Sequence, residues 1–118
     1  MSHILIVEDE ALIRSSLKRL LERHDYTVSE AGSVADACSR YSLDEFDLVI
    51  SDVRLPGEPG TVLIDKAKPT PVLIMTSFGS MKAAVDAMKQ GAVDYISKPF
   101  DHDEMLLTIE RILRETAL

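Results

Sequence analysis

Five short apolar runs alternate along this chain with segments of helical periodicity, and this alternation limits the folds that the chain can adopt. The runs are HILIV (3–7), YTVSE (26–30), DLVIS (47–51), PVLIM (71–75) and DYIS (94–97). A strand–helix–strand connection within one sheet is right-handed and leaves the two strands parallel. The pattern therefore predicts an α/β fold in which five helices cover both faces of a five-stranded parallel sheet.

Two of the intervening segments carry an apolar stripe at the spacing of an amphipathic helix. The stripes consist of Leu12, Ile13, Leu17, Leu20 and Leu21, and of Met105, Leu106, Ile109, Ile112 and Leu113. Helix ends are marked as well. Asp101 with Glu104 predicts a capping box, Ser33 with Asp36 predicts a weaker one, and Gly91 predicts a left-handed C-cap.

The length of 118 residues predicts a single domain, 1–118, that buries about 65% of the surface of its unfolded chain. Its third helix is expected to be short, because GTVLIDKAK (60–68) runs directly into Pro69 and Pro71. The single cysteine, Cys38, is expected to be a small buried residue of the second helix. Since one cysteine cannot form an internal disulfide, a reducing cytoplasm is the expected location.

The charge of the chain excludes some classes of partner. Twenty acidic against thirteen basic residues give a net charge of −7, which argues against direct nucleic-acid binding, because phosphate contacts need clustered Lys and Arg. The N-terminal apolar run is too short for a signal peptide or a membrane span. A divalent cation or a basic partner fits the charge better.

Polar side chains stand at the ends of four of the five predicted strands. They are Glu8, Asp9 and Glu10 after the first, Asp52 at the third, Thr76 and Ser77 at the fourth, and Lys98 and Pro99 at the fifth. The carboxyl ends of parallel strands share one edge of a sheet, and ligands bind at that edge. We therefore expect these side chains to form one site.

Three carboxylates at this edge need a counter-ion. If Glu8, Asp9 and Asp52 lie about 5 Å apart, each like-charge pair costs about 3 kcal/mol at an effective dielectric near 20. Lys98 alone leaves the group at −2, and an all-oxygen set favours Mg²⁺ or Mn²⁺. Glu8, Asp9 and Glu10 are also explained as the acidic first turn of a helix, but that explanation leaves Asp52 and Lys98 unaccounted for.

Asp52 has the setting of a nucleophile that attacks phosphorus. A desolvated carboxylate is costly unless it is paired, so an aspartate that ends a core strand requires a reason. A metal ion and Lys98 would stabilise charge on the transferring phosphoryl oxygens, with the Thr76 hydroxyl opposite. The residues alone thus predict that Asp52 accepts a phosphoryl group and that Thr76 and Lys98 assist the transfer.

The motifs ILIVEDE, DLVISDVRLPG, VLIMTS and GAVDYISKPF, in this order, resemble the receiver domains of two-component response regulators over nearly the whole chain. The segment from 78 to 105 is similar to receivers of NtrC-like transcriptional activators. The resemblance implies a flavodoxin-like, doubly wound sheet of order 2-1-3-4-5. It also implies that a sensor histidine kinase or a small phosphodonor phosphorylates Asp52, and that the chain is a phosphoacceptor signalling domain, with only self-catalysed phosphotransfer and autodephosphorylation.

The resemblance assigns a role to each site residue. Asp9 and Asp52 would bind Mg²⁺ directly, Glu8 through water, and Arg54 through its backbone carbonyl. Thr76 would hydrogen-bond a phosphoryl oxygen. Glu8 departs from the family pattern, since many members have Asp there, and this shifts only the outer sphere of the metal.

The resemblance also implies a conformational switch. Lys98 would pair with another phosphoryl oxygen, the Lys98–Pro99 bond would be cis, and Tyr95 would turn inward as Thr76 and the loop at 77–82 move. The fourth helix, fifth strand and fifth helix would form the readout surface, which would bind a partner protein or a second copy of the chain as a homodimer. The apolar patch there would include Met81, Ala84, Val85 and Met88. An output domain that regulates transcription would follow the segment.

Three other readings compete with this one. A haloacid-dehalogenase phosphohydrolase needs an acid two residues after its aspartate, where this chain has Arg54. A flavodoxin needs a hydroxyl- and glycine-rich phosphate loop after the first strand, where three acids stand instead. A degenerate receiver that signals by protein contacts without phosphate is the alternative, and the complete site set speaks against it.

Overall fold

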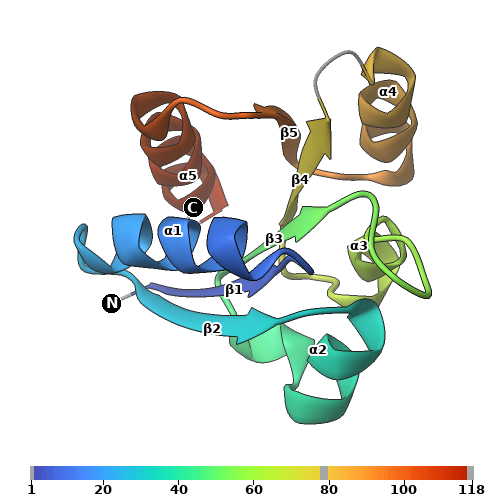
Figure 1. Ribbon diagram of the computed structural model, residues 1–118, viewed down its shortest axis with the longest axis horizontal. Helices are drawn as coiled ribbons and strands as arrows, with labels where there is room; N and C mark the ends of the chain where they lie inside the picture. The colour runs from blue at the N-terminus through green and yellow to red at the C-terminus, as the bar shows by residue number, and fades with distance from the viewer. Residues whose placement is uncertain (1, 78–79, 117–118) are drawn as a thin grey trace.

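The computed structural model describes residues 2–77 and 80–116 and confirms the predicted α/β architecture. Its strands are β1 (His3–Val7), β2 (Thr27–Ala31), β3 (Leu48–Asp52), β4 (Val72–Ser77) and β5 (Asp94–Lys98). All pair in parallel in the order β2-β1-β3-β4-β5, as expected (Figure 1). From β1 the chain adds β2 on one side of the sheet and β3, β4 and β5 on the other. A ligand site is therefore expected beyond the carboxyl ends of β1 and β3, where the strand order changes direction.

The helices cover both faces of this sheet. They are α1 (Ala11–Glu22), α2 (Val34–Arg40), α3 (Val62–Lys66), α4 (Met81–Gln90) and α5 (His102–Thr116), with a short 3₁₀ helix at Leu43–Glu45. Helices α1 and α5 lie on one face, and α2, α3 and α4 lie on the other (Figure 1). Among the described residues, no helix combines the length and the hydropathy that a membrane span requires.

Two apolar cores separate the sheet from its two helical layers. Successive strand residues point to opposite faces, so Ile4 and Ile6 pack towards α1 and α5, while Leu5 and Val7 pack towards the other layer. Every residue of β3 is buried. The end of β3 is therefore the place where a charged side chain is most strongly desolvated.

The predicted helix ends are confirmed. The Glu104 N–H donates to Asp101 Oδ2 at 3.1 Å, and the Asp36 N–H donates to Ser33 Oγ at 3.0 Å. Gly91 ends α4 with φ at 113°, in the left-handed region that glycine favours. Helix α3 has only five residues, as the following prolines predicted.

Two predictions of burial are wrong. Leu12 is 87% exposed, because it lies five residues before Leu17, and five residues turn a helix by about 140° away from the buried stripe. Cys38 is exposed as well. It lies about 100° around α2 from the buried Ala37. This short helix buries only Val34 and Ala37, so Cys38 falls outside the buried stripe.

Candidate functional site

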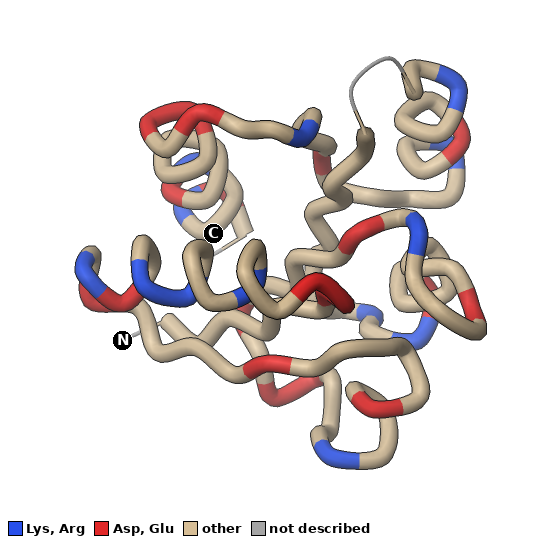
Figure 2. Tube along the Cα trace, in the orientation of Figure 1, with Lys and Arg blue, Asp and Glu red and all other residues tan. Residues whose placement is uncertain are grey.

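The register of the sheet brings the predicted acids to one place. Val7 pairs with Ser51 across β1 and β3, so Glu8 and Asp52, one residue further along, lie side by side. Glu8 is fully buried and Asp52 is 5% exposed. Figure 2 shows the acidic segment between β1 and α1 at the same edge of the sheet as the end of β3. The sheet geometry thus explains why carboxylates from separate segments meet.

Lys98 reaches the same point from the end of β5. Its backbone pairs with Ser77 at the end of β4, and its ammonium group donates to Glu8 Oε1 at 2.9 Å and to Asp52 Oδ2. The Lys98 side chain is 13% exposed, so these ion pairs are shielded from solvent screening. The structure therefore joins β1, β3 and β5 through one cation.

Backbone contacts hold Asp52 in place. Its Oδ1 accepts the Arg54 N–H at 3.1 Å, and the Gly60 N–H donates to Val53 O at 2.9 Å, which folds the following loop back onto the strand. A Cβ on Gly60 would overlap the Asp52 carbonyl oxygen. Gly60 is a site residue that the sequence reasoning missed, since a glycine after Pro59 reads as an ordinary turn.

The three predicted carboxylates form a group suited to a metal ion. Glu8, Asp9 and Asp52 each offer an oxygen, and these oxygens all lie within 4.8 Å of one another. Asp9 is exposed, so an ion has access from solvent. An all-oxygen, carboxylate-rich set fits Mg²⁺. The Arg54 carbonyl as a further ligand stays a prediction.

The electrostatics of the site show what its negative charge costs. Burial raises the pKa of Glu8 above its usual 4.5; the hydrogen bond from Lys98 opposes this rise, and Asp9 and Asp52 add to it. Burial lowers the pKa of Lys98, but its hydrogen bonds to Asp52 and Glu8 outweigh burial and raise the pKa above 10.5. Lys98 thus stays charged, while burial makes the charged form of Glu8 costly.

The residues assigned to the switch lie where the prediction placed them. Thr76 is 2% exposed and follows Met75, the β4 residue that pairs with Asp52. Tyr95 is partly buried against the core beneath α2, α3 and α4. The Lys98–Pro99 peptide bond is cis. Of the loop at 77–82, residues 78–79 lie outside the described part of the chain. The roles of Thr76 and Tyr95 stay predictions.

A second residue missed by the sequence reasoning contacts the acidic turn from α1. The guanidinium Nη1 of Arg14 donates to the Glu8 carbonyl at 2.6 Å. Side chains in a helix lean towards its N-terminus, so an arginine in the first turn can reach back to the preceding loop. Without the fold, Arg14 reads as one of several polar residues on an exposed helix face.

Comparison with known proteins identifies the family. The sequence model of the response regulator receiver domain family matches residues 4–110. The transcriptional regulatory protein FixJ of Bradyrhizobium diazoefficiens is 40% identical over 96% of this chain and 57% of its own length. ZraR of Salmonella typhimurium is 38% identical over 96% of this chain and 26% of its own length.

Solved structures agree with the sequence matches. A receiver domain protein from Clostridium thermocellum superimposes with a TM-score of 0.91 at 27% identity, covering 99% of this chain and 98% of that one. NtrX from Brucella abortus gives a TM-score of 0.91 at 30% identity, covering 98% of this chain and 28% of that one. The chain thus spans about three fifths of the length of FixJ and about a quarter of the length of ZraR. It belongs to the receiver domain family of two-component response regulators, the family in which phosphotransfer is the general function.

Proposed function

We propose that Asp52 of this receiver domain accepts a phosphoryl group from the phosphohistidine of a sensor histidine kinase, or from a small phosphodonor. The observation that carries the proposal is the contact set of Asp52. A buried carboxylate at the end of a core strand is paired with Lys98 and lies within 4.8 Å of the Glu8 and Asp9 oxygens. Structural stability alone does not require such a group, because an apolar residue would pack there at lower cost.

In the transfer, a carboxylate oxygen of Asp52 forms a bond to phosphorus as the bond from phosphorus to the donor nitrogen breaks. The donor imidazole leaves and takes up a proton from solvent. The Arg54 N–H holds Oδ1 and so fixes the carboxylate plane for in-line attack. Lys98 then exchanges its contact with Asp52 for one with a phosphoryl oxygen, where charge develops.

Glu8, Asp9 and Asp52, with the Arg54 carbonyl, would hold Mg²⁺, or Mn²⁺ in its place. When bound, the ion supplies positive charge against the carboxylates and the transferred phosphoryl oxygens. The phosphorylated site has a formal charge near −4 from Glu8, Asp9 and the acyl phosphate, and the ion with Lys98 reduces it to about −1. In autodephosphorylation, water would attack phosphorus as the bond from phosphorus to the Asp52 oxygen breaks, which returns the Asp52 carboxylate and releases inorganic phosphate.

Phosphorylation would be read out at the surface formed by α4, β5 and α5. Thr76 would hydrogen-bond a phosphoryl oxygen and Tyr95 would turn inward. Helix α4 supports an apolar contact surface: Met81, Val85 and Met88 are 61%, 44% and 40% exposed. The prediction that Ala84 joins this patch is wrong, because Ala84 is 1% exposed and packs inward. A second copy of the chain, forming a homodimer, or an output domain that regulates transcription would bind this surface.

The proposal is tested by incubating the chain with acetyl phosphate, with and without Mg²⁺, and resolving the products on a phosphate-affinity gel. We expect a retarded band only with Mg²⁺, and none from Asp52→Asn. Because a histidine kinase takes its phosphoryl group from cytoplasmic ATP, the same proposal implies a cytoplasmic location. Failure of the wild-type chain to react would favour the degenerate receiver, which signals through protein contacts alone.

A further inference from the structure

Arg14 contacts both ends of the acidic turn that precedes α1. Its guanidinium Nη1 donates to the Glu8 carbonyl at 2.6 Å, and its backbone N–H donates to the Glu10 carbonyl at 3.0 Å. Asp9, whose side chain belongs to the proposed metal site, lies between these two carbonyls. The Arg14 side chain therefore fixes the Glu8–Asp9 peptide unit, which precedes a metal ligand, while its backbone N–H makes the first hydrogen bond of the helix.

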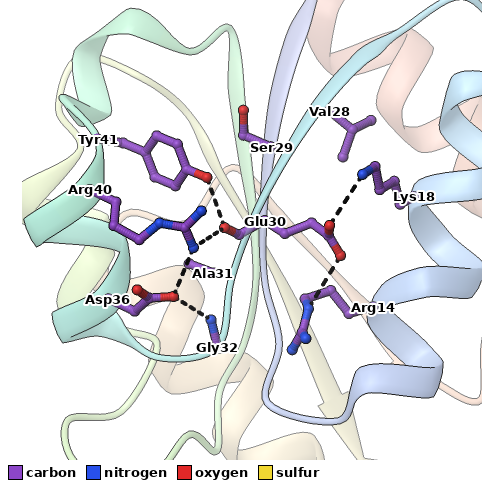
Figure 3. A pocket seen from close by; sticks show the side chains of 10 residues that line it. All are labelled: Arg14, Lys18, Val28, Ser29, Glu30, Ala31, Gly32, Asp36, Arg40 and Tyr41. Atoms are coloured by element: carbon purple, nitrogen blue, oxygen red, sulfur yellow. Dashed lines mark hydrogen bonds and ion pairs between the residues drawn. The ribbon is translucent and has the colours of Figure 1, made fainter.

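The side chain of Arg14 is itself held by the neighbouring strand. Its Nε donates to Glu30 Oε1 at 3.3 Å, and Lys18 binds Glu30 Oε2 at 3.2 Å. Figure 3 shows the Glu30 side chain extending from β2 towards α1, while its carbonyl faces Arg40 and Tyr41 on the other side. The Tyr41 hydroxyl and Arg40 Nη1 donate to that carbonyl at 3.0 and 3.2 Å. Glu30 is thus fixed at both of its ends.

The geometry requires a guanidinium in particular. A planar fork can donate to two acceptors in different directions at once, here the Glu8 carbonyl and the Glu30 carboxylate, whereas an ammonium is a compact point charge. The Arg14 side chain is 24% exposed, so this pair is less screened than a surface ion pair. A cavity of about 370 Å³ opens beside it (Figure 3), so water would replace a lost donor without holding the turn.

We propose that Arg14 is a positioning residue of the metal site. By fixing the Glu8 carbonyl it sets the direction in which the Asp9 carboxylate leaves the turn. This inference rests on the proposed function, because it concerns the affinity of the same site for Mg²⁺. The competing view is that Arg14 only ties α1 to β2 and adds stability.

The sign of the effect separates positioning from simple electrostatics. Removing a positive charge near a cation site tightens cation binding by Coulomb attraction. Loss of positioning weakens it, and losing a group that orients a metal ligand typically lowers affinity by 10–100-fold. Arg14→Gln and Lys18→Gln remove the same charge beside Glu30, but of these two residues Arg14 alone donates to the Glu8 carbonyl. Lys18→Gln is therefore the matched control.

The test is calorimetric titration of the metal-free chain and its variants with Mg²⁺. We expect about tenfold weaker binding for Arg14→Gln, unchanged or slightly tighter binding for Lys18→Gln, and partial recovery for Arg14→Lys. The initial rate of phosphorylation by acetyl phosphate should fall in Arg14→Gln at limiting Mg²⁺ and return to the wild-type rate at saturating Mg²⁺. A residue that only adds stability would lower the melting temperature and leave the Mg²⁺ affinity unchanged.

A second variant keeps the inference testable if Arg14→Gln fails to fold. Arg14→Lys keeps the positive charge and loses the planar fork, so weaker Mg²⁺ binding than in the wild type cannot result from a change of charge. Wild-type affinity in both Arg14→Gln and Arg14→Lys would overturn the inference and leave the proposed function standing. A wild-type chain that binds no Mg²⁺ would overturn both.

Discussion

Removing the Asp9 carboxylate should stabilise the metal-free protein, although Asp9 is predicted to be a functional ligand. Its ligand oxygen lies within 4.8 Å of those of Glu8 and Asp52. Lys98 forms ion pairs with Glu8 and with Asp52, whereas no cation among the described residues pairs with Asp9. In the metal-free state, Asp9 therefore repels two carboxylates and has no cation partner among the described residues.

The magnitude follows from Coulomb's law. Each repulsive pair costs about 3 kcal/mol at an effective dielectric near 20, and about 1 kcal/mol in bulk water. Asp9 is exposed, so its two pairs lie near the aqueous limit and together cost about 2 kcal/mol. A carboxylate beside the N-terminus of α1 gains about 0.3–1 kcal/mol from the helix dipole. We therefore expect Asp9→Asn to raise the free energy of unfolding by about 1 kcal/mol.

Mg²⁺ should reverse this order. A ligand at a hundredfold excess over its Kd stabilises the folded state by about 2.7 kcal/mol, and the variant lacks a ligand for it. The assay is urea unfolding followed by far-ultraviolet circular dichroism, with and without Mg²⁺. Asp103→Asn is the control, because Asp103 is an exposed acid in the first turn of α5, outside the site. A metal-free Asp9→Asn less stable than wild type, or equal stabilisation of both by Mg²⁺, would refute the reasoning.

Further predictions concern pH, a glycine and an exposed leucine. The folded state raises the pKa of Glu8, so protonation of Glu8 adds to the free energy of unfolding. This contribution is full below pH 4.5 and is lost as the pH rises through the raised pKa. Urea titrations of metal-free Glu8→Gln should lack this loss. The contribution of Lys98 is full below pH 10.5 and is lost above it, as the same titrations of Lys98→Met would show. Gly60→Ala should lose about 1–3 kcal/mol and slow acetyl phosphate turnover, whereas Gly57→Ala, with φ at 81° and open space around it, should lose about 1 kcal/mol and retain turnover. Leu12→Gln should change stability by less than about 0.5 kcal/mol, because the side chain is 87% exposed; a larger loss in urea unfolding would contradict this.

The parallel direction of the strands followed from the sequence because it depends on local pattern, whereas the strand order came from the family resemblance. An apolar run such as that preceding Asp52 has too few polar residues for an exposed element, and alternation with helices leaves a parallel sheet as the fold. The site followed for a related reason: parallel strands bring their carboxyl ends to one edge, so Glu8, Asp52 and Lys98 converge whatever the loops do. The ion pairs of Lys98 confirm that convergence.

The sequence predicted less well what depends on tertiary contacts. Leu12 and Ala84 were assigned to the wrong environments: Leu12 lies about 140° around α1 from the buried stripe and stays exposed, whereas Ala84 is 1% exposed and packs inward. The contact of Arg14 with Glu8 joins a helix to a loop and depends on Glu30 in the neighbouring strand. No spacing rule identifies a residue that acts through a backbone carbonyl.

The central claim is that Asp52 itself becomes the acyl phosphate. Borohydride reduces an aspartyl phosphate to homoserine, so the chain can be treated with acetyl phosphate and Mg²⁺, reduced, digested and sequenced by mass spectrometry. The account predicts homoserine at position 52 and at no other aspartate, and none when Mg²⁺ is chelated first. Homoserine at another aspartate, or an unmodified Asp52 peptide in the presence of Mg²⁺, would contradict the account.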